Sequence, residues 1–153
     1  MSDDPGQAIH GLVQEYDEKA IITEIALRAA AMSKTAAVAS ELNPEVQEDA
    51  EHLGIKEDVL ELGGRIFRRV ERELHEVICG NSAEDKKDRD SILKATGLGD
   101  IALGTALYTA LTASLGLAPA VATVVAALLI KRIFQPAGAE FCKFWGDKIT
   151  KRS

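Results

Sequence analysis

The stretch IALGTALYTALTASLGLAPAVATVVAALLI, residues 101–130, contains no charged side chain. A single straight helix of this length would span roughly 45 Å. Gly116 and Pro119 lie at its middle, where a glycine typically ends one helix and a proline opens the next. We therefore predict an antiparallel hairpin with its turn at Gly116 and Pro119. Each arm would reach roughly 23 Å, which is less than the roughly 30 Å hydrocarbon core of a bilayer.

Small residues recur every four positions along both predicted arms, and in the first arm a parallel row of leucines accompanies them. Small side chains at this spacing let two helix backbones approach each other closely. We therefore predict that the two arms pack together through these stripes. The predicted packing residues are Ala102, Ala106, Ala110 and Ser114 on the first arm and Ala118, Ala122 and Ala126 on the second.

The chain before the hairpin shows the period of amphipathic helices. Apolar residues recur at steps of three and four from Gln7 to about Leu42, and again from Ile55 to Cys79. The triplet Asn43-Pro44-Glu45 is typical of a helix start, so we predict the second helix to begin there. Gly63-Gly64 lies inside that second pattern and costs about 1 kcal/mol per glycine relative to alanine, which indicates a close helix crossing or a kink.

A shorter charged helix is predicted to start at Ser82 and to end near Lys94. The 153 residues are enough for one compact domain with a single core. We predict an all-α fold, a helical bundle of about five to six helices whose hairpin is either central or inserted in a membrane. Its predicted parts are a disordered acidic N-terminus (1–6), an amphipathic helical region (7–96), the hydrophobic hairpin (97–135) and a basic, aromatic C-terminal helix (136–153).

The net charge of −6 is unevenly distributed. Residues 1–100 hold 22 acidic and 12 basic residues, whereas residues 101–153 hold 2 acidic and 6 basic ones. The acidic first part argues against nucleic acid as a partner, because binding to phosphate backbones needs a basic surface. The basic, apolar second part points to anionic lipid or to the acidic half of the protein itself.

Aromatic and basic residues gather after the hairpin, as they do at a membrane interface. The alternative is that the aromatic side chains lie in the core while the lysines face water. The residues expected at an interface with membrane or partner are Lys131, Arg132, Phe134, Phe141, Phe144, Trp145, Lys148, Lys151 and Arg152. A second charged face, from Arg65 to Arg72, is either solvated or binds a protein partner.

No pattern in the sequence indicates catalysis. There is no phosphate-binding loop, nucleophile elbow or catalytic Cys/His arrangement. A di-metal site is disfavoured, because Arg72 stands where a ligand carboxylate would precede His75. Cys79 and Cys142 lie far apart and are expected to be reduced thiols of an intracellular protein. We therefore expect a non-enzymatic protein without cofactor or metal.

Two functions fit these expectations. The first is a membrane-associating or membrane-inserting protein, an anchor or pore type that is oligomeric and uses the hairpin, with its basic side on the cytoplasmic face. The acidic, polar N-terminus predicts no cleaved signal, which also favours a cytoplasmic protein. The second is a soluble homo-oligomeric bundle that acts as an interaction or adaptor protein. Self-association is expected there, because two amphipathic helices would cover the hairpin only in part.

Overall fold

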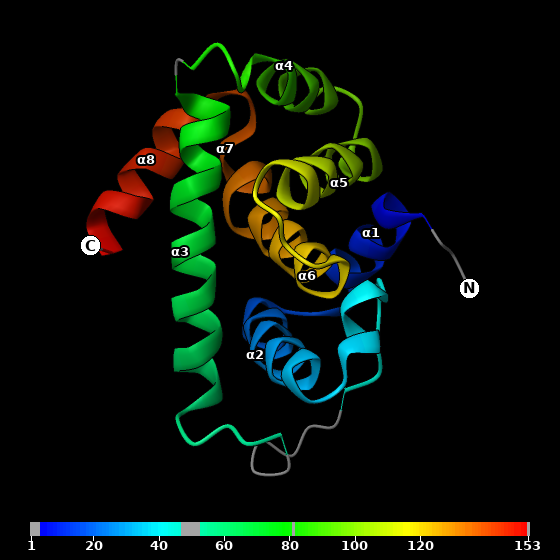
Figure 1. The fold of residues 1–153 in the computed structure, drawn as a ribbon. Helices are drawn as coiled ribbons and strands as arrows, with labels where there is room; N and C mark the ends of the chain where they lie inside the picture. Colours follow the sequence, from blue (N-terminus) through cyan, green and yellow to red (C-terminus); the bar gives the residue numbers. More distant parts are fainter. Residues whose placement is uncertain (1–3, 47–52, 81, 153) are drawn as a thin grey trace.

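The computed structural model describes residues 4–46, 53–80 and 82–152, and these contain helices and no strand (Figure 1). The prediction of an all-α bundle is confirmed. The α-helices are α1 (Pro5–Glu15), α2 (Glu18–Lys34), α3 (Val59–Cys79), α4 (Lys86–Ala95), α5 (Asp100–Thr109), α6 (Pro119–Leu129), α7 (Gln135–Ala137) and α8 (Phe141–Arg152). The short 3-10 helices are η1 (Ala36–Ser40) and η4 (Gly138–Glu140), and the π-helical turns η2 (Ala110–Ser114) and η3 (Ile130–Phe134) extend α5 and α6.

Helix α6 lies at the centre of the bundle (Figure 1). Every residue from Ala120 to Ile130 is buried, and α1, α2, α5 and η1 pack around the helix. The continuous helical stretch Pro119–Ala137 is long and apolar enough to cross a membrane, but 72% of its most apolar window is buried inside the protein. One copy of the chain therefore covers this helix by itself. Self-association of the chain remains a prediction.

The N-terminal helical region starts earlier than predicted and is divided in two. Pro5 occupies the first turn of α1, and the side chain of Asp4 caps it by accepting a hydrogen bond from the Gly6 amide at 2.9 Å. The prediction of disorder is therefore wrong for residues 4–6, whereas residues 1–3 lie outside the described part. The single helix predicted from Gln7 to Leu42 breaks after Glu15, because Asp17 caps a new helix by accepting from the Ala20 amide at 2.8 Å.

The predicted helix start at Asn43-Pro44-Glu45 is wrong. These residues are not helical, and α3 begins at Val59, where the Asp58 carboxylate accepts hydrogen bonds from the first-turn amides. The side chain of Asn43 has a different partner, since its Oδ1 atom accepts a hydrogen bond from Arg28 at 2.6 Å. Part of the segment in between, residues 47–52, lies outside the described residues.

Arg28 is the fully buried cation that joins three parts of the fold. Its Nη1 atom donates to the carbonyl oxygens of Leu42 (3.1 Å) and Ala120 (3.0 Å) and to the hydroxyl of Thr123 (3.0 Å). Its Nε atom pairs with Glu24 at 2.9 Å. Burial lowers the pKa of Arg28, and the nearby Glu24 carboxylate opposes that effect. The guanidinium thus connects α2, the segment after η1 and the first turn of α6.

Replacing Arg28 by leucine is expected to destabilise the protein by about 3 kcal/mol, because it leaves several buried acceptors without a donor. Chemical denaturation followed by circular dichroism measures the loss. The matched control is Arg68→Leu at an exposed position of α3, where we expect a change within about 0.5 kcal/mol. An equal loss of unfolding free energy in the two variants would show that the buried contacts of Arg28 do not stabilise the fold.

The glycine pair of α3 marks a close helix crossing. A Cβ atom added to Gly63 would overlap the carbonyl oxygen and side chain of Ile22 on α2. At Gly64 the nearest outside atom is Nη1 of Arg68 at 3.2 Å, the end of a flexible side chain. Gly63 therefore allows α2 and α3 to touch, which confirms the close crossing inferred from the sequence, while Gly64 faces outward.

The two glycines are expected to respond oppositely to alanine. Gly63→Ala forces α2 and α3 apart and should cost at least about 1–3 kcal/mol of unfolding free energy. Gly64→Ala should be neutral or gain up to about 1 kcal/mol, because alanine is the better helix former. Urea denaturation of both variants tests this difference. A Gly63→Ala protein as stable as Gly64→Ala would contradict the crossing.

Candidate functional site

The predicted hairpin packing residues differ in their exposure. On the second arm, Ala122 and Ala126 are fully buried, and Ala118 is half-buried just before α6. The first arm buries Ala110, whereas its remaining small residues are half-buried (Ala102, Ala106) or exposed (Ser114). The parallel leucine row, Leu103, Leu107 and Leu111, faces the core. Mutual packing of the two alanine stripes remains a prediction.

The turn residues and a glycine contact position the first arm. Gly116 has a φ of 72° in the connection between the arms, a value that favours glycine, and Pro119 opens α6. The close approach that the structure shows for α5 is to α1. A Cβ atom on Gly6 would overlap Thr105 and the Ile101 carbonyl, and one on Gly104 would lie 3.2 Å from Ile9. Glycines therefore let α1 lie against α5.

The aromatic residues of the predicted interface mostly belong to the core. Phe141 and Trp145 are 1% and 0% exposed, and Phe134 packs on Phe141 with ring centroids 4.6 Å apart. Only Phe144 is half-buried, with the ammonium group of Lys148 5.1 Å from its ring centre. Three of the four aromatics thus follow the core alternative that the sequence left open.

The basic residues of the predicted interface divide into two groups. Lys131 donates to the Val13 carbonyl at 2.8 Å, and Arg132 pairs with Glu18 at 2.8 Å while lying over the ring of Phe67. Both are therefore engaged within the bundle. Lys151 is exposed and Lys148 half-buried on α8. Arg152 lies in the last turn of α8, and its side chain is outside the described part.

Cys79 and Cys142 form a disulfide, so the prediction that both are reduced thiols is wrong. Although 63 positions separate them in the sequence, α3 and α8 lie side by side, which brings the two Cα atoms within 5.7 Å. The bond joins the end of α3 to the start of α8. The spacing of the two cysteines in the sequence did not predict the disulfide, because the cysteines meet only when α3 and α8 pack side by side in the folded chain.

A buried contact reinforces the junction of α3 and α8. The indole Nε1 of Trp145 donates to Oε2 of Glu71 at 3.1 Å. Glu71 is 1% exposed although it is a carboxylate, and a buried acid of this kind needs such donors. The imidazole of His75 packs edge to face against the indole of Trp145, with the ring centroids 5.1 Å apart. These contacts and the disulfide fix the position of α8 along α3.

The outer side of α3 carries four exposed arginines: Arg65, Arg68, Arg69 and Arg72. Together with Glu73 they line a shallow hollow of about 340 Å³. Arg65 forms a bidentate ion pair with Glu57, in which its Nη1 and Nη2 atoms donate to the two carboxylate oxygens at 2.7 and 2.8 Å. This pair holds the pKa of the Glu57 carboxyl below its usual value. For the other three, the part of the chain that the structure describes provides no ion pair.

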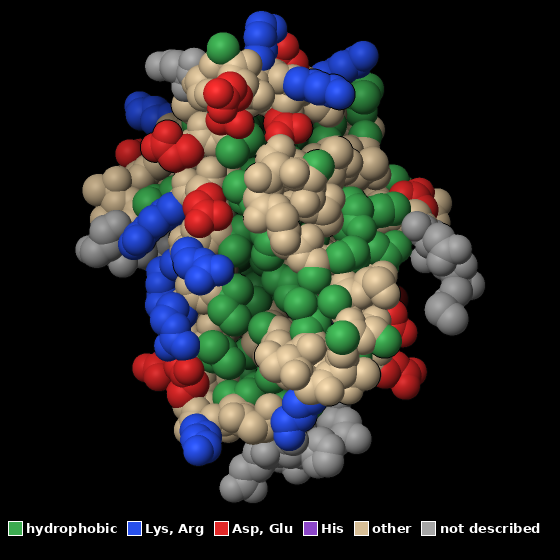
Figure 2. Space-filling view, viewed as in Figure 1, with side chains coloured by type: hydrophobic (Ala, Val, Ile, Leu, Met, Phe, Trp, Pro, Cys, Tyr) green, Lys and Arg blue, Asp and Glu red, His purple; other side chains and the backbone are tan. Residues whose placement is uncertain are grey.

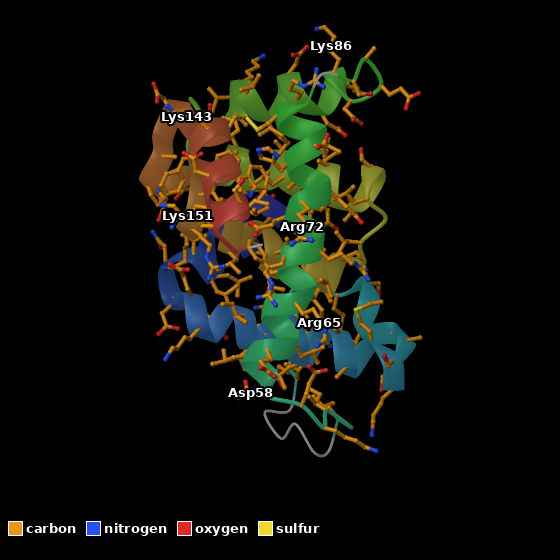
Figure 3. All side chains as sticks on the ribbon, turned by 90° about the vertical axis from the view of Figure 1, so that its left-hand side faces the viewer. Asp58, Arg65, Arg72, Lys86, Lys143 and Lys151 are labelled. Atoms are coloured by element: carbon orange, nitrogen blue, oxygen red, sulfur yellow. A yellow bond between two sulfur atoms is a disulfide. The ribbon has the colours of Figure 1, made fainter. Side chains whose placement is uncertain are left out.

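We define the basic face as these four arginines of α3 together with Lys143, Lys148 and Lys151 of α8. A band of basic side chains runs down the left side of the molecule, over α3 (Figure 2). Turned toward the viewer, α3 and α8 stand next to each other, with Arg65 and Arg72 on one and Lys143 and Lys151 on the other (Figure 3). The fold therefore places the arginines of α3, a helix with equal numbers of acidic and basic residues, next to the basic helix α8 in a protein whose net charge is −6.

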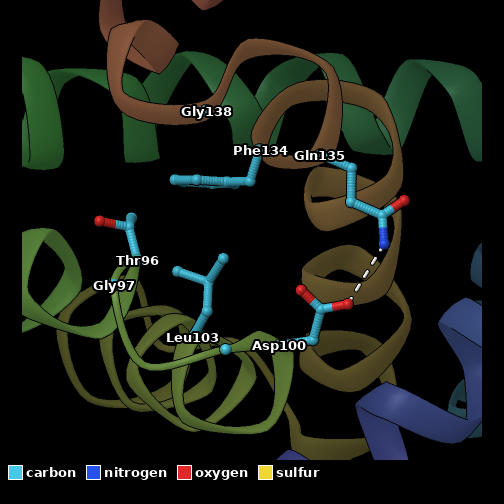
Figure 4. A pocket seen from close by; sticks show the side chains of 8 residues that line it. Thr96, Gly97, Asp100, Leu103, Phe134, Gln135 and Gly138 are labelled. Atoms are coloured by element: carbon cyan, nitrogen blue, oxygen red, sulfur yellow. Dashed lines mark hydrogen bonds between the residues drawn. The ribbon is translucent and has the colours of Figure 1, made fainter.

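A separate cavity of about 260 Å³ lies between the α4–α5 connection and the end of the long central helix (Figure 4). The ring of Phe134 lies on one side of it and Leu103 on the other. The carboxylate of Asp100 closes a third side and accepts a hydrogen bond from Gln135 at 3.2 Å. Thr96, Gly97, Gly99 and Gly138 complete the lining.

Comparison with known proteins adds no relative. The chain matches no family model, no curated protein and no solved structure.

The disulfide is expected to stabilise the fold strongly. Cross-linking two residues 63 positions apart lowers the entropy of the unfolded chain by an amount equivalent to about 4 kcal/mol. Thermal unfolding with and without a thiol reductant should therefore show a clear fall in Tm. The control is the double variant Cys79→Ser with Cys142→Ser, whose Tm should be low and should not respond to the reductant. A wild-type Tm unaffected after complete reduction would contradict this expectation.

Proposed function

We propose that this chain is a non-enzymatic, membrane-associating protein that docks on an anionic lipid surface through the basic face of α3 and α8. The observation that carries the proposal is a set of exposed arginines that form no ion pair within the described part of the chain: Arg68, Arg69 and Arg72. Arg68 and Arg72 carry like charges four positions apart, so they repel each other across one turn of α3. A surface of phosphates relieves that repulsion.

The chemistry of the arginine side chain supports phosphate as the counterpart. A guanidinium presents several N–H donors in one plane and binds phosphate through two hydrogen bonds, whereas an ammonium acts as a point charge. Arg65, Arg68 and Arg72 follow one another at steps of three and four along α3, so they share one side of the helix. Such a row contacts several headgroups of a flat surface at once.

Helix α8 adds charge and an apolar contact beside that row. The ring of Phe144 is half-buried. It forms one wall of a hollow of about 350 Å³, whose other walls are Asp147, Lys148 and Lys151. A partly exposed aromatic ring among lysines suits the boundary between headgroups and acyl chains. The proposed contact is peripheral, with α6 remaining inside the bundle as its core.

The disulfide bears on where such docking takes place. Disulfides persist in oxidising compartments, whereas the cytosol keeps thiols reduced. The expectation of a cytoplasmic protein rested in part on reduced cysteines, and it loses that support. We therefore propose a membrane surface that faces an oxidising compartment.

Vesicle co-sedimentation tests the proposal. The protein should pellet with vesicles containing phosphatidylglycerol, remain in the supernatant with pure phosphatidylcholine, and dissociate as salt rises. The variant Arg68→Gln with Arg69→Gln and Arg72→Gln should bind about a hundredfold more weakly, since each basic residue near the surface contributes about 1 kcal/mol.

The matched control removes the same charge from other exposed positions, by Lys19→Gln with Lys87→Gln and Lys94→Gln on α2 and α4. This variant should bind like the wild type. Equal weakening in both triple variants would mean that net charge alone matters and would overturn the docking face. Failure to bind anionic vesicles would overturn the membrane function and leave the soluble homo-oligomer, which light scattering after gel filtration measures. Leakage of a trapped dye would instead mean that the hairpin inserts.

A further inference from the structure

The cavity between Thr96 and Gly138 lies at the ends of two helices. It begins directly after α4, which ends at Ala95, and it is closed by Gly138, which follows the end of α7 at Ala137. The last carbonyl oxygens of α4 do not supply a binding site, because they already accept hydrogen bonds from Thr96, Gly97 and Leu98. The negative potential in the cavity comes from Asp100, which lies in the first turn of α5 and lines the cavity.

The walls of the cavity combine this negative potential with apolar surface. Phe134 and Leu103 are 6% and 5% exposed and lie opposite each other, so they offer an aromatic ring and a branched aliphatic side chain (Figure 4). The other side of Phe134 is supported by Phe141 and Trp145, which hold the ring in place. The face of an aromatic ring attracts a cation through its quadrupole.

Asp100 provides the charge that selects a ligand. Among the described residues it forms no ion pair, and its hydrogen bond from Gln135 reaches only Oδ2, which leaves Oδ1 available. Figure 4 shows the carboxylate directed toward the space between Phe134 and Leu103. A carboxylate, an aromatic face and an aliphatic wall around one small space match a cation that has an apolar body.

We propose that this cavity binds a small organic ammonium ion, with the charged nitrogen between Asp100 and the ring of Phe134 and its alkyl groups against Leu103. The volume of about 260 Å³ restricts the ligand to a small molecule. The site lies apart from the basic face, and the proposal does not depend on membrane docking.

Choline and 3,3-dimethylbutan-1-ol, which has carbon in place of the charged nitrogen, are the probes for this site. Calorimetric titration should show saturable binding of choline and binding of the alcohol that is weaker by about tenfold, as expected for a cation–π contact with a partner carboxylate. In ¹H–¹⁵N NMR spectra, choline should shift the amide signals of Gly97, Gly99 and Gly138.

The substitution Asp100→Asn keeps the shape of the side chain and should weaken choline binding by about tenfold. Asp90→Asn removes the same charge from an exposed position of the neighbouring helix α4 and should leave binding unchanged. Equal affinity for choline and the alcohol, shifts at residues away from the cavity, or undiminished binding by a folded Asp100→Asn protein would each overturn the proposal. The comparison of the two probes uses the wild-type protein, so it decides the question even if Asp100→Asn does not fold.

Discussion

The rest of the structure depends on one constraint, which is that α6 has no polar side. From Ala120 to Ile130 each residue is buried, so apolar surface has to be supplied all around the helix. The amphipathic helices α1 and α2 and the leucine row of α5 provide it, and glycines at the crossings let the helices lie close enough together. The polar groups at the start of α6 are satisfied by Arg28, whose charge is paired with Glu24.

Local patterns in the sequence predicted the parts of the fold that local interactions determine. The charge-free segment, the helical periods and the close crossing at Gly63 depend on neighbouring residues and on side-chain size. The predictions failed at residues whose structure is determined by contacts with distant parts of the sequence. Asn43 looked like a helix cap, yet its amide is held by Arg28, and Cys79 was assigned to a reduced state because its partner is adjacent only in the folded chain.

The two candidate sites differ in the same way. The arginine row of the basic face follows from spacing along one helix, so the sequence alone pointed to it. The cavity is built from residues 96–103 and 134–138, which meet only after the chain has folded, and Phe134 had been assigned to an interface instead. Aromatic residues at helical spacing occur in a core more often than at a membrane boundary, and burial by neighbouring helices distinguishes the two.

The disulfide between Cys79 and Cys142 determines what happens to the molecule when a protease cuts its backbone. It closes a covalent ring that contains α4, α5, α6 and α7, including the exposed glycine-containing connections around Gly97 and Gly116. Exposed connections of this kind are where proteases cut first. A single cut inside the ring leaves both pieces covalently attached, with α3 and α8 still joined at one end. The oxidised protein can therefore lose the continuity of its backbone and remain one molecule.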